Sequence, residues 1–172
     1  MMKKIGLGLV AGVVATAVMD ASQTSLIPAV SSWLSSLRGH QPDDDSPSDS
    51  SQESQPESSP EKVAHRAADL LGIALSREEL STWGNRVHWV YGAQWGSVYS
   101  TVGMPRSPLG GFGFGALLWL GSDELLLWAL GIAGKPTNYP LSVHISALAA
   151  HLVYGGVLGT MLAGFESTWP SD

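Results

Sequence analysis

The sequence predicts an all-α integral membrane protein: a bundle of four antiparallel transmembrane helices, with a short amphipathic helix and a disordered acidic linker. The first observation is the distribution of charge, since 15 of the 24 charged residues lie between Arg38 and Arg86. Only about 7% of the other residues carry charge, against roughly 25% in an ordinary soluble domain. The second observation is a series of long apolar runs outside that segment. So few charges cannot cover the surface of a soluble protein, so we expect lipid around these runs.

Composition excludes several functional classes. The length of 172 residues fits one domain. The chain has no cysteine, which excludes a disulfide scaffold, a thiolate nucleophile, an iron–sulfur cluster and a zinc site built on cysteine. Its net charge of −6 and the lack of a basic patch argue against a nucleic-acid partner. We expect the lipid bilayer as a partner and no cofactor.

Residues 1–30 are predicted to form the first transmembrane helix. Its apolar run, Ile5 to Ile27, is long enough to span a bilayer, contains a single charge at Asp20 and stops at Pro28. The alternative is a secretory signal cleaved after the small residues around Ala17. We favour the retained helix because its pattern continues past Ala17.

Residues 31–60 are predicted to be a disordered acidic linker, because residues 39–60 contain no large apolar side chain to offset the entropy of ordering. Residues 61–85 are predicted to hold an amphipathic helix and the start of the next one. Ser59 and Pro60 resemble a cap and a first helical residue, and Ser76 with Glu79 forms a capping box. The amphipathic helix either lies against the membrane or the bundle, or is a small soluble cap.

Residues 86–166 are predicted to form a three-helix transmembrane region. Its spans are Arg86–Gly103, Leu109–Ile132 and Ser142–Phe165. Because short loops join them, consecutive spans must be antiparallel neighbours. Lys3, Lys4 and Arg106 favour an N-terminus in the cytoplasm, whereas Arg86 and Lys135 oppose it; we expect both termini inside.

Small residues recur at every fourth position in three of the spans. We expect these faces to be helix-packing surfaces, because small residues let helix backbones approach closely in lipid. The run Gly110–Gly115 opens a span and follows no βαβ unit, so it also predicts close packing rather than a phosphate site. The glycines concerned in the three spans are Gly8 and Gly12, Gly92 and Gly96, and Gly155 and Gly159.

Six ionisable residues lie within the apolar spans, and alternating topology places them toward one side of the membrane. Carboxylates in a membrane need partners or a function. Three interpretations stay open: a structural hydrogen-bond network, a proton or ion pathway or small-ligand site, and a metal or catalytic site, although no HExxH motif is present. Adjacent carboxylates point about 100° apart on a helix, so they need different partners. The six candidates are Asp20, His88, Asp123, Glu124, His144 and His151.

These motifs resemble the YagU-like family of bacterial inner-membrane proteins, a domain of unknown function. The resemblance covers roughly residues 62–160, and the acidic linker departs from it. It implies a multi-helix membrane protein in the inner membrane and no established reaction. The match rests on His88-Trp89 with Gly92, Gly96 and Tyr99, on Phe114 to Glu124, and on Tyr139 to Ser142 with His144 and His151 to Gly155.

The function predicted from the sequence is that of a non-enzymatic, multi-pass protein of the prokaryotic cytoplasmic membrane. Its buried histidines and carboxylates form a polar network that responds to protons or ions. The alternatives are a metal-dependent membrane enzyme and an accessory subunit of a larger membrane complex. Four short spans enclose little volume, which leaves a homo-oligomer open.

Overall fold

The computed structural model describes residues 1–26 and 57–168, and these residues form helices and no strand. The all-α prediction is therefore confirmed for the described residues. The predicted stop at Pro28 and most of the acidic linker lie outside them. In chain order the elements are α1 (Met2–Ala21), the π-helix η1 (Ser22–Leu26), α3 (Ser59–Leu71), α4 (Arg77–Thr101), α5 (Pro108–Leu118), the π-helix η2 (Trp119–Leu126), α6 (Leu127–Ala129), the 3-10 helix η3 (Pro136–Asn138) and α7 (Leu141–Thr168).

Helix α3 begins with a capping box. The Ser58 N–H donates to the Glu61 carboxylate at 2.7 Å, and the Glu61 N–H donates to the Ser58 hydroxyl at 3.4 Å. The cap is therefore one residue earlier than predicted, and Ser59 is the first helical residue. Gly72 ends the helix with φ of 70°, a left-handed conformation that glycine adopts without the penalty of a Cβ atom.

Helix α4 begins with the predicted capping box of Ser76 and Glu79. It continues to Thr101, and the following turn is held by the Tyr99 hydroxyl, which donates to the Pro105 carbonyl at 2.6 Å. Helix α5 then starts after the cap residue Ser107, and Pro108 at its first position favours a helix start there.

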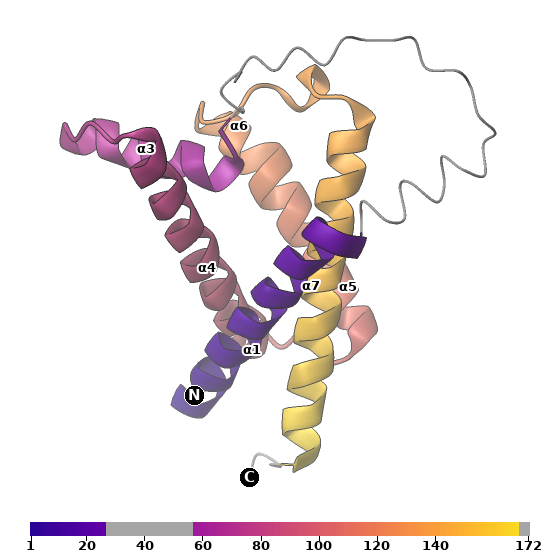
Figure 1. Cartoon of the computed structure of the whole chain (residues 1–172). Helices are drawn as coiled ribbons and strands as arrows, with labels where there is room; N and C mark the ends of the chain where they lie inside the picture. Colours follow the sequence, from indigo (N-terminus) through magenta and orange to yellow (C-terminus); the bar gives the residue numbers. More distant parts are fainter. Residues whose placement is uncertain (27–56, 169–172) are drawn as a thin grey trace.

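Helices α1 and α4 cross at close range (Figure 1). A Cβ atom built on Gly12 would lie 2.6 Å from the Gly92 carbonyl oxygen, and one on Gly8 would lie 2.5 Å from the Gly96 carbonyl oxygen. Glycine at these positions is therefore required by the contact itself. Two interhelical hydrogen bonds accompany it, one of them from the Ser100 hydroxyl to the Lys4 carbonyl at 2.8 Å.

Helices α5 and α7 form the second close pair. Cβ atoms built on Gly111 and Gly155 would collide with the opposite helix's backbone, each at the other's carbonyl oxygen. Gly115 likewise faces the backbone of His151, and Gly159 that of Ser107. The glycine-rich start of α5 is thus a helix-packing surface.

The two helix pairs are joined mainly through α1 and α7, while α3 packs on α4. Figure 1 shows α3 and the beginning of α4 extending away from the other helices, and the start of α1 and the end of α7 at the opposite end of the bundle. The core at the junction is formed by Ala11, Ala15, Tyr99, Phe114, Tyr154 and Leu158.

The prediction of four membrane spans is supported for two of them. Met2–Ser25 and Leu141–Thr168 are long and apolar enough to cross a membrane by length and composition. Helix α4 falls short because charged residues occupy its first turns up to Arg86 and because glycine and polar residues interrupt the apolar residues after it. The third predicted span is divided, because α5 ends at Leu118 and continues as a π-helix that carries Asp123 and Glu124.

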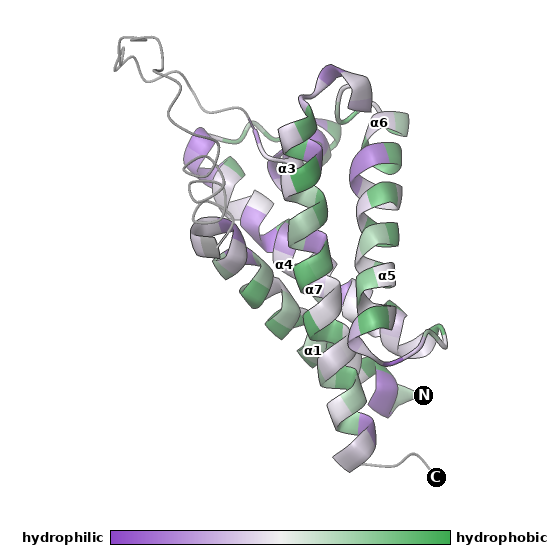
Figure 2. Ribbon diagram, turned by 90° about the vertical axis from the view of Figure 1, so that its right-hand side faces the viewer, coloured by the Kyte–Doolittle hydropathy of each residue, from purple (hydrophilic) through white to green (hydrophobic). Residues whose placement is uncertain are grey.

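Large apolar side chains cover much of the outside of the bundle. Figure 2 shows that hydrophobic residues recur along α1, α5 and α7. Side chains of this kind that are more than 40% exposed include Val10, Val90, Leu109, Leu117, Leu125 and Ile145. A surface this apolar is typical of a protein surrounded by lipid or covered by a partner.

Candidate functional site

A cavity of about 430 Å³ lies between the α1–α4 pair and the α5–α7 pair. Its walls are mostly apolar, and the beginning of α3 borders it through Ser59, Pro60 and Val63. The polar groups on its walls include His88, Asp123 and His151, three of the six residues singled out from the sequence.

The first histidine–carboxylate pair joins α1 to α4. His88 Nε2 lies 2.8 Å from Asp20 Oδ1, a hydrogen bond in which the imidazole N–H donates to the carboxylate. The close contact of the two helices places these side chains opposite each other, one turn beyond the contact of Thr16 with Gly92. Both side chains are partly exposed, His88 toward the cavity.

The second pair joins α7 to η2 across the cavity wall. His151 Nε2 lies 3.8 Å from Asp123 Oδ2, which is beyond hydrogen-bonding distance. His151 Nδ1 lies 2.9 Å from the Ala147 carbonyl oxygen, which accepts but cannot donate. Nδ1 therefore carries a proton in every state that keeps this bond, and Nε2 of the neutral ring is an acceptor. The Asp123 carboxylate also accepts from the Ser122 hydroxyl at 3.1 Å.

The third pair lies outside the cavity, at the end of the bundle near η3. His144 Nδ1 lies 2.6 Å from Glu124 Oε1, and His144 Nε2 lies 3.0 Å from the Pro136 carbonyl oxygen. Both ring nitrogens of His144 face oxygen atoms that accept hydrogen bonds. One proton on Nε2 is donated to the Pro136 carbonyl, and a second proton lies between Nδ1 and the Glu124 carboxylate. Glu124 and His144 thus bind the start of α7 to η2. The structure places the six candidate residues in three separate pairs and not in one group.

Asp123 and Glu124 are adjacent on the π-helix η2 but reach different partners. The two side chains diverge, Asp123 toward His151 and Glu124 toward His144. The Ser122 hydroxyl donates to the Leu118 carbonyl at 2.6 Å at the start of the same stretch. Short π-helical segments occur frequently at functional sites, and here the segment supplies the carboxylate that borders the cavity.

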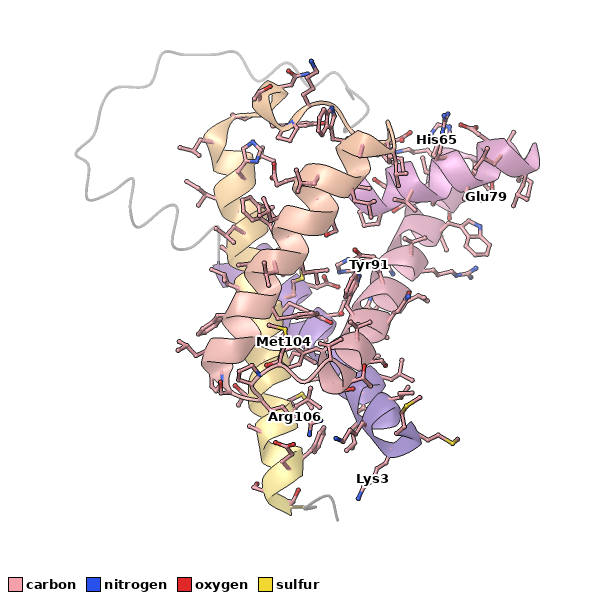
Figure 3. The ribbon with its side chains drawn as sticks, turned by 180° about the vertical axis from the view of Figure 1, so that it is seen from behind. Lys3, His65, Glu79, Tyr91, Met104 and Arg106 are labelled. Atoms are coloured by element: carbon pink, nitrogen blue, oxygen red, sulfur yellow. The ribbon has the colours of Figure 1, made fainter. Side chains whose placement is uncertain are left out.

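Two tyrosines on the cavity wall are not among the candidates that the sequence predicts. The Tyr154 hydroxyl donates to the Gly92 carbonyl at 2.6 Å and so joins α7 to α4. Tyr91 lies on the side of α4 that faces α5 (Figure 3) and borders the same cavity. An aromatic residue at helical spacing in an apolar run is predicted to pack in the core. The neighbouring sequence does not distinguish such a residue from one that borders a cavity.

The described residues contain no group of three or more His, Cys, Asp or Glu side chains that could hold a metal ion. The histidines and carboxylates that the structure brings together form pairs instead.

Comparison of the chain with protein-family models, with curated proteins and with solved structures finds no match in any of the three.

Proposed function

We propose that this chain is a multi-pass membrane protein, without enzymatic activity, whose cavity takes up and releases protons through its histidine–carboxylate pairs. The observation that carries the proposal is that His88, which is paired with Asp20, lines the same cavity as the Asp123–His151 pair, so that four different helical elements contribute to the two pairs. Histidine beside a carboxylate titrates near neutral pH, and such groups inside a membrane are typical of proton-dependent proteins.

The unequal geometry of the two pairs supports a proton-dependent change. The Asp20–His88 pair is closed by a hydrogen bond, whereas 3.8 Å separates His151 Nε2 from Asp123. A proton on Nε2 converts two facing acceptors into an ion pair with a donor between them. Protonation of His151 therefore draws α7 and η2 together, and loss of the proton lets them separate.

We propose four membrane spans and not two. The half of α4 from Val87 to Thr101 carries no Asp, Glu, Lys or Arg. Elements α5, η2 and α6 follow one another from Pro108 to Ala129, about 30 Å of helix at about 1.5 Å per residue. Leu117 and Leu125 on this stretch are 62% and 49% exposed, which suits contact with lipid.

The location and orientation complete the proposal. Lys3 and Arg106 lie at the end of the bundle where α1 begins and α7 ends (Figure 3), and cationic residues favour the cytoplasmic side. We propose that both termini are cytoplasmic and that the chain resides in the inner membrane. The resemblance of residues 62–160 to the YagU-like family remains a proposal that agrees with this location.

The number of spans is tested by single cysteines, which need no background substitution because the chain has none. Ala74→Cys and Thr137→Cys are expected to react with a membrane-impermeant maleimide from one side, and Val102→Cys and Ser167→Cys from the other. All four positions are exposed. Labelling of Ala74→Cys and Val102→Cys from the same side would remove the second span, and labelling of Val102→Cys and Thr137→Cys from the same side would remove the third.

The proton function is tested in proteoliposomes that contain a pH-sensitive dye. We expect wild-type protein to change the rate of proton equilibration or its own tryptophan fluorescence between pH 5.5 and pH 8, and His151→Phe to abolish that change. The matched control is His65→Phe, which removes an exposed histidine of α3 outside the cavity. Unchanged behaviour of His151→Phe would leave the pairs with a structural role only. Stoichiometric metal in purified protein, lost in His144 or His151 variants, would instead support a metal-dependent enzyme.

A further inference from the structure

The pair of Asp123 and His151 on the cavity wall has a defined chemical character. With Nδ1 donating to Ala147, neutral His151 presents an acceptor at Nε2, and the Asp123 carboxylate presents a second acceptor 3.8 Å away. Two acceptors that face each other in an apolar cavity need a donor between them. A proton on the imidazole fulfils that need in one state. In the other state an N–H group of a bound molecule can supply the donor.

The rest of the cavity defines the remainder of that molecule. Its volume of about 430 Å³ lies within the range that binds small molecules, roughly 300–1,000 Å³. Apolar side chains dominate the walls, and no Lys or Arg lines them. Tyr91 and Tyr154 contribute aromatic rings, which attract cations. The apolar walls at the level of the two pairs include Met19, Val87, Leu118, Leu127 and Ala150.

We propose that the cavity binds a lipophilic primary or secondary amine in its ammonium form, with N–H groups donating to Asp123 Oδ2 and to Nε2 of neutral His151. The apolar body of the ligand occupies the space among the four helical elements. The inference rests on the proposed proton function, because the ammonium group in the cavity and the imidazole proton compete for the same two acceptors. Binding of one excludes the other, which makes the site an exchanger of a proton for an organic cation.

The exchange depends on the charged and titratable groups around His151. From η2 these are Asp123 and Glu124, but Glu124 is bonded to His144. From α4 they are His88 and Tyr91, and from α1 Asp20, which is bonded to His88. The residues of α3 that border the cavity do not titrate. Asp123 is therefore the carboxylate available to an ammonium group, and His151 is the group whose protonation competes with it.

The experiment uses the full chain in lipid nanodiscs and three probes with the same apolar body: octylamine, octyltrimethylammonium and octanol. Octylamine is a cation with N–H donors, octyltrimethylammonium is a cation without them, and octanol is uncharged. Binding is measured by calorimetry at pH 8 and pH 5.5, with protein-free nanodiscs subtracted. We expect saturable binding of octylamine at pH 8, weaker by about tenfold or more at pH 5.5, and at least about tenfold weaker binding of the other two probes.

Two variants localise the site. Asp123→Asn is expected to weaken octylamine binding by about tenfold or more at pH 8. The matched control is Glu124→Gln, which removes the adjacent carboxylate and is expected to change binding by less than about twofold. Equal weakening by both variants, or none by Asp123→Asn, would overturn the site. If Asp123→Asn does not fold, equal affinities of the three probes for the wild-type protein would overturn it.

The two proposals fail in different ways. A pH response of wild-type proteoliposomes that His151→Phe abolishes, together with no octylamine binding, would overturn the amine site and leave the proton function. Octylamine binding that depends on Asp123 but has the same affinity at both pH values would overturn the exchange of proton for cation.

Discussion

The Tyr154 hydroxyl donates a hydrogen bond of 2.6 Å to the carbonyl oxygen of Gly92, a group that also lies against Gly12. Three helices therefore meet at one backbone carbonyl, because Gly12 belongs to α1, Gly92 to α4 and Tyr154 to α7. The contact lies between the two helix pairs and borders the cavity. It joins α4 to α7 next to the cavity between the two helix pairs, and we expect it to fix the width of that cavity.

Tyr154→Phe is expected to destabilise the protein by about 1 kcal/mol, the net value of a typical intramolecular hydrogen bond. The ring remains and fills the same space, so only the bond to Gly92 is lost. Thermal unfolding in detergent measures the effect. The control is Tyr91→Phe, on the same cavity wall, whose hydroxyl has no hydrogen-bond partner among the described residues. An equal loss of stability in both variants would contradict a special role for the Tyr154 bond.

Gly12→Ala is expected to destabilise the protein by about 2 kcal/mol, as overpacking does in a filled interior. Its Cβ would lie 2.6 Å from the Gly92 carbonyl oxygen, a backbone atom that moves only if α1 and α4 separate. The matched control is Gly6→Ala on the same helix, where nothing lies within 4 Å. Since alanine is the better helix former, Gly6→Ala is expected to be neutral or slightly stabilising. Denaturation of the wild type and the two variants in parallel measures these differences in stability. Equal stabilities of the three proteins would argue against the close contact of α1 with α4.

Periodicity and charge are enough to identify the packing faces and the ionisable residues. Glycines at every fourth position define a face from the sequence alone, because i and i+4 lie on one side of a helix. The scarcity of charge makes Asp20, Asp123 and Glu124 conspicuous in apolar runs. The adjacency of the two acids predicts that their side chains diverge, and they do.

The partners of these residues could not be predicted, because they depend on how each helix is rotated against the next. His144 and His151 both lie on α7, and only tertiary packing decides which carboxylate each one faces. The π-helical stretch adds to the difficulty, since its wider turns change the angle between residues before and after Asp123. A prediction that assumes a regular α-helix therefore assigns the residues after the π-helix to the wrong face of the helix.

Acidification is expected to loosen α3 from the bundle through its capping box. The backbone N–H of Ser58 donates to the Glu61 carboxylate and, with smaller contributions from the Ser58 hydroxyl and Arg77, holds the pKa of Glu61 below its usual value of 4.5. A carboxylate with a lowered pKa contributes its full stability above the usual value, and the contribution is lost as pH falls through the lowered pKa. Amide exchange in α3 should therefore rise below about pH 4, after correction for its intrinsic rate.

Glu61→Gln separates this titration from the cap itself. Glutamine accepts the same backbone hydrogen bond but carries no charge, so exchange in α3 is expected to become independent of pH over that range. Glu78→Gln is the control and should behave as wild type, because Glu78 lies in the first turn of α4 but is neither of the two residues that form its capping box. If amide exchange in α3 keeps its full pH dependence in Glu61→Gln, that dependence comes from a group other than Glu61.

The Glu124–His144 pair is expected to be energetically coupled, in contrast to a similar pair on the surface. Both side chains are less than one fifth exposed, and His144 is also bonded to Pro136. A double-mutant cycle of Glu124→Gln and His144→Gln should therefore give a measurable coupling that is larger than that of an exposed pair.

The reference for this cycle is His65 with Glu57, which are 3.0 Å apart but 49% and 29% exposed. The same cycle on that pair should give less than about 1 kcal/mol. Unfolding measured at low and high salt completes the comparison, because screening should reduce the coupling of the exposed pair and spare that of Glu124 with His144. Equal coupling energies in the two cycles would show that burial at the start of α7 adds nothing to the pair.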